Sequence, residues 1–593
     1  MCGVFGYLGE EKKNLSTFLV DGLSKLEYRG YDSAGIAILS NGHSRIFRQV
    51  GEISNLKKFL NGRVYSGSVG LGHTRWATHG KVTKKNAHPH KDCTGGVIVA
   101  HNGIIENYEK IKKSLQKKGH KFTSDTDTEV FAHLVEEKLR GGRLSFAEAV
   151  RKSFNRLDGL NAVVVLGGNG KMVGFRLGSP LVAGIDTNAS YISSDIPALT
   201  SLTDKIILLE EGEGVLLEKS GIFKIDPKTG KVTRAKSKKL RMQEVVSNKG
   251  KYEHFLLKEI YEQPEVLARV AANNKKDILK AASLIKNAWG TYFTACGTAA
   301  HAGLAATYMF SEIAKTHVNF AVGSEFPYFE DFLVRRSLLI AASQSGETMD
   351  TLEAVRAAKR HKSKVLSLVN VPGSSLTRLS DYSIYLEAGP ERAVLSTKAY
   401  IAKLAVFLLF AYTLAGKYDE GVRLLINTSN QLSKMFKNDL EKKVKKLSRK
   451  LVEEKHLYII GRGVNYPTAL EGALKIKEAS YIHAEGFAGG ELKHGVIALV
   501  EPGTPCIAVV ANDRAKSSVL SNATELASRG GFIIGISPRN EKVFDYFIPV
   551  SDAGSASPIV SVVPMQLLAY HLTVLKGYNP DRPRNLAKSV TVK

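Results

Sequence analysis

The sequence predicts an α/β protein that begins with stacked sheets covered by helices and continues as two doubly wound parallel-sheet halves. Three observations predict this class. Short strands and glycine-rich turns fill the first part of the chain, up to about residue 239. Apolar strands alternate with helices in the remainder, which is typical of parallel sheets flanked by helices. Finally, strand, turn and helix recur there at an offset of about 165 residues, for example at Thr291–Thr298 and His456–Gly463.

Composition and charge limit the partners that we expect. The chain has 593 residues, 83 Lys and Arg against 57 Asp and Glu, and a net charge of +26. The basic tracts Lys231–Lys251 and Lys434–Lys455 lack interleaved aromatics, which favours solvated surfaces over a nucleic-acid arm. The longest apolar run, Leu404–Gly416, is too short to span a bilayer and predicts a buried helix. We therefore expect neither nucleic acid nor membrane as a partner.

The cysteines, at positions 2, 93, 296 and 506, form no Cys-x-x-Cys pair. This spacing predicts neither a disulfide framework nor a zinc site. Because no secretory signal opens the chain, we expect a cytoplasmic protein. His88-Pro-His90 looks like a pair of metal ligands, but no third ligand is close in the sequence, so we predict no metal.

The first six residues, Met-Cys-Gly-Val-Phe-Gly, predict a nucleophile at the N-terminus. Removal of Met1 would give Cys2 both a thiol and a free α-amine. An α-amine has a pKa of about 7.7–8.0, so it can accept the thiol proton without a neighbouring histidine. Gly3 and Gly6 allow the strand to approach a neighbouring backbone closely. A frayed terminus is the alternative interpretation.

Three clusters in the same region suit an amino acid with a side-chain amide. Arg75 offers a planar fork for a carboxylate, and Trp76 beside it is a large movable lid. Asn102-Gly103 combines a side-chain amide with a backbone N–H that can face an oxyanion. Asp127 can hold an ammonium group. The alternatives are, in turn, a surface ion pair, a hairpin turn and a helix cap.

The segments MCGVFGY, KLEYRGYDSAG, GHTRWATHG, HNGIIENY and SDTDTE resemble the class II glutamine amidotransferase domain, a four-layer αββα N-terminal-nucleophile hydrolase. The resemblance implies that Cys2 attacks the glutamine amide with its own α-amine as base, and that Asn102 and Gly103 form the oxyanion hole. It also implies that the glutamine carboxylate and amine are held by Arg75 and Asp127, that the site is lined by Thr78 and His79, and that ammonia passage is gated by Trp76.

A polar segment without sustained periodicity, Ala235–Lys251, separates this region from the rest. We expect domain limits at the following positions: 2–239 for the glutaminase domain, 240–250 for a linker, 251–430 and 431–580 for the two parallel-sheet domains, and 581–593 for a C-terminal tail that completes the second site.

The segment after an apolar strand, Ser343-Gln-Ser-Gly-Glu-Thr348, leads into a helix predicted at Met349–Arg360. Ligands of doubly wound sheets bind at the carboxyl ends of strands, and a helix N-terminus rich in hydroxyls suits a phosphate. Ordinary Ser/Thr capping is the alternative.

Two further features suggest a charged site in the C-terminal part. Glu471, Lys475 and Glu478 are spaced to share one helix face, although a surface ladder of alternating charge would have the same spacing. The tail keeps apolar residues to its end, so it can pack and deliver Lys588 to a site.

The segments CGT, SQSGET, LSTKA, LEGALKIKEASYIHAE, GELKHG and RNLAKSVTV resemble the paired sugar isomerase domains, of flavodoxin-like doubly wound fold, of the glutamine–fructose-6-phosphate aminotransferase family. The resemblance implies that Lys588 forms a Schiff base with C2 of the sugar, Glu478 moves a proton between C1 and C2, and His494 opens the ring. It places at the sugar site Glu471 and Lys475, and assigns sugar-phosphate binding to Cys296, Gly297, Thr298, Ser343, Gln344, Ser345, Thr348, Val394 and Ser396.

The implied reaction makes glucosamine 6-phosphate from glutamine and fructose 6-phosphate, the first step of amino-sugar biosynthesis, with no cofactor such as pyridoxal phosphate. A histidine supplied by the adjacent subunit implies a homodimer or higher homo-oligomer. Ala299, Leu395 and Val496 depart from the family pattern. A different sugar-phosphate acceptor, or a sugar-phosphate sensor without turnover, therefore stays open as an alternative.

Overall fold

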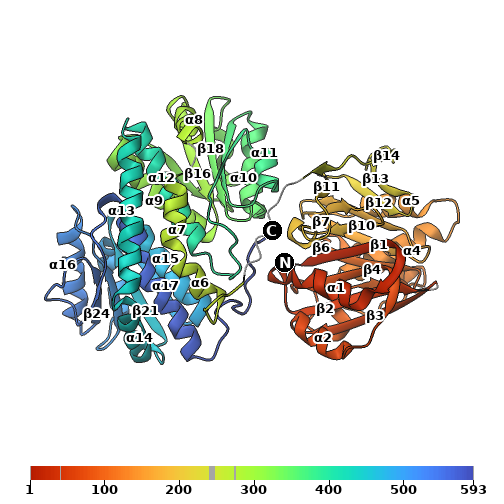
Figure 1. The fold of residues 1–593 in the computed structure, drawn as a ribbon, viewed down its shortest axis with the longest axis horizontal. Helices are drawn as coiled ribbons and strands as arrows, with labels where there is room; N and C mark the ends of the chain where they lie inside the picture. The colour runs from red at the N-terminus through yellow and green to blue at the C-terminus, as the bar shows by residue number, and fades with distance from the viewer. Residues whose placement is uncertain (1, 41, 240–247, 273–274, 592–593) are drawn as a thin grey trace. The chain divides into compact units, whose positions relative to one another are not determined.

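A computed structural model describes residues 2–40, 42–239, 248–272 and 275–591. It contains two compact units, Met1–Val246 with Ser589–Lys593, and Ser247–Lys588 (Figure 1). Met1, whose removal we expect, and residues 240–247 of the expected linker lie outside the described residues.

The first unit contains two antiparallel sheets. One has the order β15-β11-β9-β10-β1-β4-β2-β3, and the other has the order β14-β13-β12-β8-β7-β6-β5. The strands are β1 Gly3–Asn14, β2 Ser33–Ser40, β3 His43–Val50, β4 Ser66–Arg75, β5 His90–Lys91, β6 Val97–Gly103, β7 Asn161–Gly167, β8 Met172–Leu177, β9 Val182–Ile185, β10 Ala189–Ser193, β11 Lys205–Leu208, β12 Gly214–Glu218, β13 Gly221–Ile225, β14 Val232–Arg234 and β15 Lys238–Lys239. The helices are α1 Leu15–Ser24, α2 Ile53–Leu60, α3 Tyr108–Lys117, α4 Thr128–Leu139 and α5 Phe146–Phe154.

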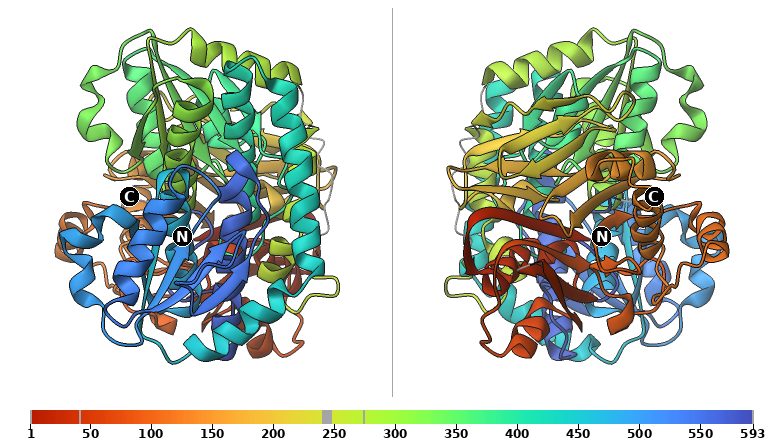
Figure 2. Two further views of the ribbon diagram at one scale, coloured as in Figure 1. Left: turned by 90° about the vertical axis from the view of Figure 1, so that its left-hand side faces the viewer. Right: turned by 90° about the vertical axis from the view of Figure 1, so that its right-hand side faces the viewer.

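Alternation along the central strands explains why both faces of each sheet are covered. In β1, Val4 packs in the core between the two sheets, whereas Phe5 packs in the core beneath α1 and α2. In β6, Ile98 faces the same inter-sheet core and Val99 faces α4 and α5. Successive side chains of a strand point to opposite faces, so helices must cover the outer sides. Figure 2 shows the two sheets as stacked layers, and the predicted αββα architecture is confirmed.

The second unit contains two parallel sheets of five strands, ordered β17-β16-β18-β19-β20 and β22-β21-β23-β24-β25. Both have the flavodoxin-like strand order 2-1-3-4-5, so the predicted repeat is confirmed. The strands are β16 Gly290–Ala295, β17 Asn319–Val322, β18 Ser337–Ser343, β19 Lys364–Val369, β20 Tyr382–Tyr385, β21 His456–Gly461, β22 His483–Ala488, β23 Pro505–Val509, β24 Phe532–Ser537 and β25 Tyr546–Pro549. The helices are α6 Phe255–Tyr261, α7 Gln263–Ala271, α8 Lys275–Lys286, α9 Gly297–Met309, α10 Met349–Arg360, α11 Ser375–Leu379, α12 Lys398–Leu414, α13 Tyr418–Lys437, α14 Leu440–Leu451, α15 Tyr466–Ser480, α16 Lys516–Ala527 and α17 Ser557–Leu575.

The helices of this unit differ in how far they are buried. The apolar run at Leu404–Gly416 lies mostly in α12, which is buried along most of its length, as predicted. The basic tract Lys434–Lys455 contains the end of α13 and all of α14, and the apolar stripe of α14 is buried while most of its lysines face outward. The segment Gly554–Leu575, which contains α17, is long and apolar enough to cross a membrane by length and composition, and 89% of its apolar window is buried. In the sequence, Gln566 and His571 interrupt its apolar residues, so it contains no long continuous apolar run.

Candidate active sites

Cys2 lies directly before β1, a central strand of the first sheet. The backbone N–H of Trp76 donates to Cys2 Sγ at 3.3 Å, and Cys2 Sγ lies 3.5 Å from the carbonyl oxygen of Trp76. Arg29 Nε donates to the carbonyl oxygen of Cys2 at 3.0 Å, and Arg29 is itself buried in an ion pair with Asp195. The chain is therefore tied into the sheet from Cys2 onward, rather than frayed.

The surroundings of Cys2 favour the protonated thiol. Burial raises the pKa of the Cys2 thiol, and the Trp76 N–H and the Arg75 guanidinium only partly offset this effect. His73 lies on the neighbouring strand β4, but burial lowers its pKa to about 3, and burial also lowers the pKa of His101. These imidazoles are weak bases, so activation of the thiol needs another group.

Arg75 ends β4 and is 3% exposed. Its guanidinium donates to the carbonyl oxygens of His79, Gly80 and Lys81. Among the described residues no carboxylate lies within 4.0 Å of the Arg75 guanidinium. The alternative of a surface ion pair is therefore wrong. A buried guanidinium without a carboxylate suits an anionic ligand.

Asn102 and Gly103 lie in β6, paired with Ala162 and Asn161 of β7, so the hairpin-turn alternative is wrong. Both polar atoms of the Asn102 side chain are buried, and neither makes a hydrogen bond of normal geometry with the part of the chain that is described. Leaving such a group unpaired costs about 1–3 kcal/mol. Gly103 has φ +133°, and a Cβ there would lie 2.2 Å from the carbonyl oxygen of Leu160, so only glycine fits.

Asp127 occupies the N-cap position of α4 but makes no capping hydrogen bond through its side chain. Its Oδ2 instead accepts from the backbone N–H of Ile105 at 2.8 Å, two residues beyond Gly103. Trp76 is half-buried and contacts the ring of Tyr31 edge-on at 6.0 Å. This contact links Trp76 to Tyr31, a residue that the motifs did not single out as functional.

Thr78 and His79 are less closely tied to this group. Thr78 is exposed. His79 contacts the Tyr108 ring at 5.3 Å, and its Nδ1 is buried without a hydrogen-bond partner in the described chain. The structure thus places Cys2, Trp76 and Arg75 close together, and Asp127 contacts the segment that follows β6. Thr78, in contrast, lies on the surface.

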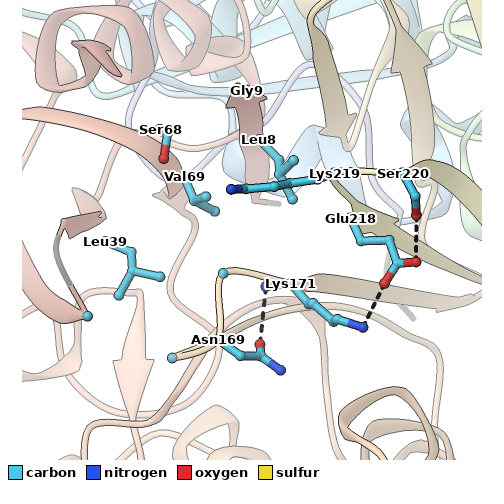
Figure 3. A pocket seen from close by; sticks show the side chains of 13 residues that line it. Leu8, Gly9, Leu39, Ser68, Val69, Asn169, Lys171, Glu218, Lys219 and Ser220 are labelled. Atoms are coloured by element: carbon cyan, nitrogen blue, oxygen red, sulfur yellow. Dashed lines mark hydrogen bonds and ion pairs between the residues drawn. The ribbon is translucent and has the colours of Figure 1, made fainter. Parts of the chain in front are cut away.

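A pocket of about 530 Å³ in the same unit contains none of these residues. It lies at the start of β4, near Ser68, and is bordered by Leu8 of β1. In Figure 3 Lys171 reaches Glu218 across one side of it, at 2.7 Å. Arg75 is at the other end of β4, roughly 20 Å away at about 3.4 Å per residue. We therefore do not assign the chemistry to this pocket.

The predicted phosphate loop joins β18 to α10. Ser343 Oγ lies 2.9 Å from Thr348 Oγ1 and accepts from the N–H of Gly346, while Ser345 Oγ accepts from the N–H of Glu347. Thr348, at the N-cap of α10, makes no capping hydrogen bond through its side chain. The hydroxyls therefore shape the loop rather than cap the helix, against the capping alternative.

A second loop lies at the same edge of this sheet, because β16 and β18 are parallel neighbours. Cys296, Gly297 and Thr298 follow β16 and begin α9, and Cys296 Sγ lies 3.6 Å from Thr351 Oγ1 of α10. Gln344 is half-buried in the first loop. Ligands of such sheets bind beyond the carboxyl ends of the strands, where both loops are.

Glu471, Lys475 and Glu478 form a mostly buried network on α15, so a surface charge ladder is the wrong interpretation. Lys475 Nζ donates to the Glu478 carboxylate and, at 2.9 Å, to Thr298 Oγ1, and it lies 3.6 Å from Glu471. Burial lowers the pKa of Lys475, but the two carboxylates outweigh it and raise that pKa above its usual value. Glu471 also lies 2.8 Å from His301 Nδ1.

Lys588 is held by a buried carboxylate that the motifs did not indicate. Its Nζ lies 2.6 Å from Glu391 Oε2, with side-chain exposures of 5% and 0%. Glu391 also accepts from the Ser396 hydroxyl and from the N–H groups of Thr397 and Ala399. Burial raises the pKa of Glu391, but Lys588 and these hydrogen bonds outweigh it and lower that pKa to about 2.

The sequence motifs did not indicate Glu391, His301 or Lys403, although the structure places all three in or beside this network. Lys403 is 1% exposed on α12, and burial lowers its pKa to about 8. The signal that could have indicated Lys403 is a lysine within an otherwise apolar helix, because such residues are rarely buried without a role.

Other predicted residues lie apart from this network. His494 ends the 3₁₀ helix Gly489–His494 and is exposed, and within the described chain it has no hydrogen bond or ion pair with the other sugar-site residues. Val394 is half-buried, and its N–H donates to the carbonyl oxygen of Asp581. Two of the three departures from the family pattern, Ala299 and Leu395, are buried in the core.

Comparisons with known proteins agree with this division. A family described as "Glutamine amidotransferase domain" matches residues 60–211, and one described as "SIS domain" matches residues 284–412 and 450–576. The chain is 44% identical over 600 residues to the glutamine–fructose-6-phosphate aminotransferase [isomerizing] of Pyrococcus horikoshii, covering 100% of both. The chain belongs to the glutamine–fructose-6-phosphate aminotransferase family.

Other members of the glutamine–fructose-6-phosphate aminotransferase family match over the same length. Those of Thermococcus kodakarensis and Thermotoga maritima are 43% and 40% identical, with 100% of each chain covered. A solved structure, the C-terminal domain of glucosamine-fructose-6-phosphate aminotransferase from Francisella tularensis, is 35% identical with a TM-score of 0.53, and covers 57% of this chain and 100% of its own. The family's amidotransferase match falls on the unit with Cys2, and its two SIS matches fall on the two parallel sheets.

Proposed function

We propose that this chain converts glutamine and fructose 6-phosphate into glutamate and glucosamine 6-phosphate. The observation that carries the proposal is full-length identity of 40–44% to relatives named for this activity. Two separate sets of buried polar residues, one in each unit, support it, because the reaction needs a site that frees ammonia and a site that uses it.

In the glutaminase half, Cys2 Sγ attacks the side-chain amide, and its α-amine, freed by removal of Met1, takes the thiol proton. The weakly basic histidines nearby support this choice of base. Asn102 and the N–H of Gly103 stabilise the oxyanion. Arg75 binds the glutamine carboxylate and Asp127 binds its amine. Thr78 and His79 line the glutamine site, and Trp76 gates the passage of ammonia.

In the sugar half, the hydroxyl-rich loop 343–348 binds the phosphate, with Gln344, the 296–298 loop, Val394 and Ser396 around the sugar. Lys588 forms an imine with C2 and releases water, which makes C1 more acidic. Glu478 then moves a proton from C1 to C2 after ammonia replaces the lysine. Glu471 and Lys475 set the charge around Glu478.

Ring opening is assigned to His494, as a residue that acts in the site of a partner subunit. Its exposure in this chain supports that assignment, and we therefore propose a homodimer or higher homo-oligomer. We also propose the domain limits 2–239, 251–430 and 431–580, with a linker between the first two and a C-terminal tail from 581 that carries Lys588.

A product assay paired with an N-terminal mass measurement tests the proposal. The purified chain should begin at Cys2 and should form glucosamine 6-phosphate from glutamine and fructose 6-phosphate. Acceptor-dependent release of glutamate across a panel of ketose phosphates should be greatest with fructose 6-phosphate. Full activity from a chain that retains Met1 would refute the role of the α-amine, and greater turnover with another ketose would refute the acceptor.

A further inference from the structure

A cluster of four potential metal ligands lies in the first unit, apart from the predicted catalytic residues. Cys93 comes from the turn between β5 and β6, His120 from the loop after α3, and His133 and Glu136 from α4. One ligand atom from each residue lies within 4.8 Å of all the others.

Four of the separations between these ligand atoms are close to those of a tetrahedral site, and all of them are within 4.8 Å. Cys93 Sγ lies 3.5 Å from His133 Nδ1 and 3.9 Å from His120 Nδ1. Glu136 Oε2 lies 3.0 Å from His120 Nδ1 and 3.2 Å from His133 Nδ1. Bonds of about 2.0–2.3 Å to zinc in tetrahedral geometry put neighbouring ligand atoms roughly 3.3–3.6 Å apart. Small shifts would therefore bring all four atoms to bonding distance of one ion.

The far side of each imidazole faces a carboxylate. His120 Nε2 lies 3.1 Å from Glu137 Oε2, and His133 Nε2 lies 3.7 Å from Glu129 Oε1. A carboxylate behind a histidine is the usual way in which a metal-binding ring is oriented, with its other nitrogen turned to the metal. Arg140 pairs with Glu136 Oε1 at 2.9 Å, whereas Glu136 Oε2 faces the cluster and also accepts from the backbone N–H of Cys93 at 3.2 Å.

Charge and access also suit a dication. A Cys93 thiolate and the Glu136 carboxylate together balance two positive charges, and the N–H of Lys121 donates to Cys93 Sγ at 3.4 Å. His120, His133 and Glu136 are buried, whereas Cys93 is exposed and offers an entry path.

We propose that Cys93, His120, His133 and Glu136 bind one zinc ion as a structural site. Four protein ligands complete a tetrahedral shell and leave no open position for catalysis. The ion would join the turn that begins β6 to the helix α4. These two elements also carry Asn102 and Asp127, so zinc would stabilise the glutamine end of the unit. The same contacts without a metal would be a network of hydrogen bonds and ion pairs, which is the alternative.

Metal analysis of the full chain, purified without chelator or histidine tag, tests the proposal. We expect about one zinc per chain. Cys93→Ser should lose most of it, whereas the matched variant Cys506→Ser, at a cysteine in the second unit, should retain it. Chelator-treated chain should melt several degrees lower and recover with zinc. It should also bind cobalt with a thiolate charge-transfer absorbance that Cys93→Ser lacks.

The chelation and re-addition measurements use the wild-type chain, so they decide the question even where a variant folds poorly. Less than about 0.1 zinc per chain, with no cobalt absorbance and no response of the melting temperature to zinc, would overturn the proposal in favour of the hydrogen-bonded network. Full zinc content in Cys93→Ser would overturn this ligand set.

Discussion

The predicted glutamine site of the first unit and the charged network of the second hold their buried polar groups in opposite ways. Asn102 keeps both atoms of its amide unpaired, and Arg75 has no carboxylate partner in the described chain. Lys588 and Lys475, in contrast, are each paired with carboxylates of the same unit.

The difference follows from the charge that each site must handle. The Asn102 amide is neutral, so it can stay unpaired at a cost of about 1–3 kcal/mol. Arg75 is charged, but its guanidinium donates to three backbone carbonyl oxygens. Buried ammonium groups without partners would cost much more, and Lys475 and Lys588 of the second unit are accordingly each paired with a carboxylate.

Removal of the thiol is the change with the largest expected effect. Cys2→Ala should lower glutamine-dependent synthesis by at least about 10³-fold, because no other group can form the thioester. Binding of fructose 6-phosphate should be unchanged, as measured by calorimetry. A parallel loss of sugar binding in a folded variant would mean that the two sites are not separable.

Replacement of Lys588 tests the charged network of the second unit. Lys588→Arg keeps a cation beside Glu391 but cannot form an imine, so synthesis should be lost while glutaminase activity and folding persist. Lys588→Ala should lose synthesis too and, since it strands a buried carboxylate, should also lower the free energy of unfolding by about 3–5 kcal/mol. Denaturant titration distinguishes the two variants, and synthesis by either one would refute the imine.

Asn102→Ala should lower kcat for glutamine hydrolysis by about 10²–10³-fold with little loss of stability, because the amide makes no hydrogen bond of normal geometry in the described chain. Asn86 is the matched control. It is buried and bonds to Lys81 and Asp125, so Asn86→Ala should mainly lower the melting temperature. A large fall in stability for Asn102→Ala would show that its role is structural.

The smallest expected effect concerns pH. The pKa of Glu391 is about 2 in the folded chain and near 4.5 when unfolded, so its contribution to stability is complete above about pH 4.5 and is lost as the pH falls toward 2. Glu391→Gln should abolish this part of the acid sensitivity, a difference of about 3 kcal/mol. If the free energy of unfolding changed equally with pH in wild type and variant between pH 2 and 5, the ion pair would be contradicted.

Much of the fold was predictable because local pattern and topology agree. The repeat in the second unit and the helix Met349–Arg360 follow from strand and helix periodicity, and the structure has both. Glu471, Lys475 and Glu478 were placed on one face, but their burial was not predictable, since it depends on packing against other helices.

Residues that act through distant contacts could not be found from sequence spacing. Glu391 meets Lys588 from 197 positions away, and His301 meets Glu471 from 170. The zinc ligands that we propose come from three segments, so no short motif contains them. Both cases need the fold before the chemistry becomes visible.

Three hydrogen bonds besides the Lys588 ion pair hold the Glu391 carboxylate, and they have a consequence for the imine that we propose at Lys588. When Lys588 forms the imine that we propose, the carboxylate still accepts from Ser396, Thr397 and Ala399, and these hydrogen bonds hold it in place. Its negative charge then stabilises a protonated imine, or a second cation beside a neutral one. An inhibitor that traps the lysine and also carries a protonated amine at that distance should gain affinity from this anchored negative charge.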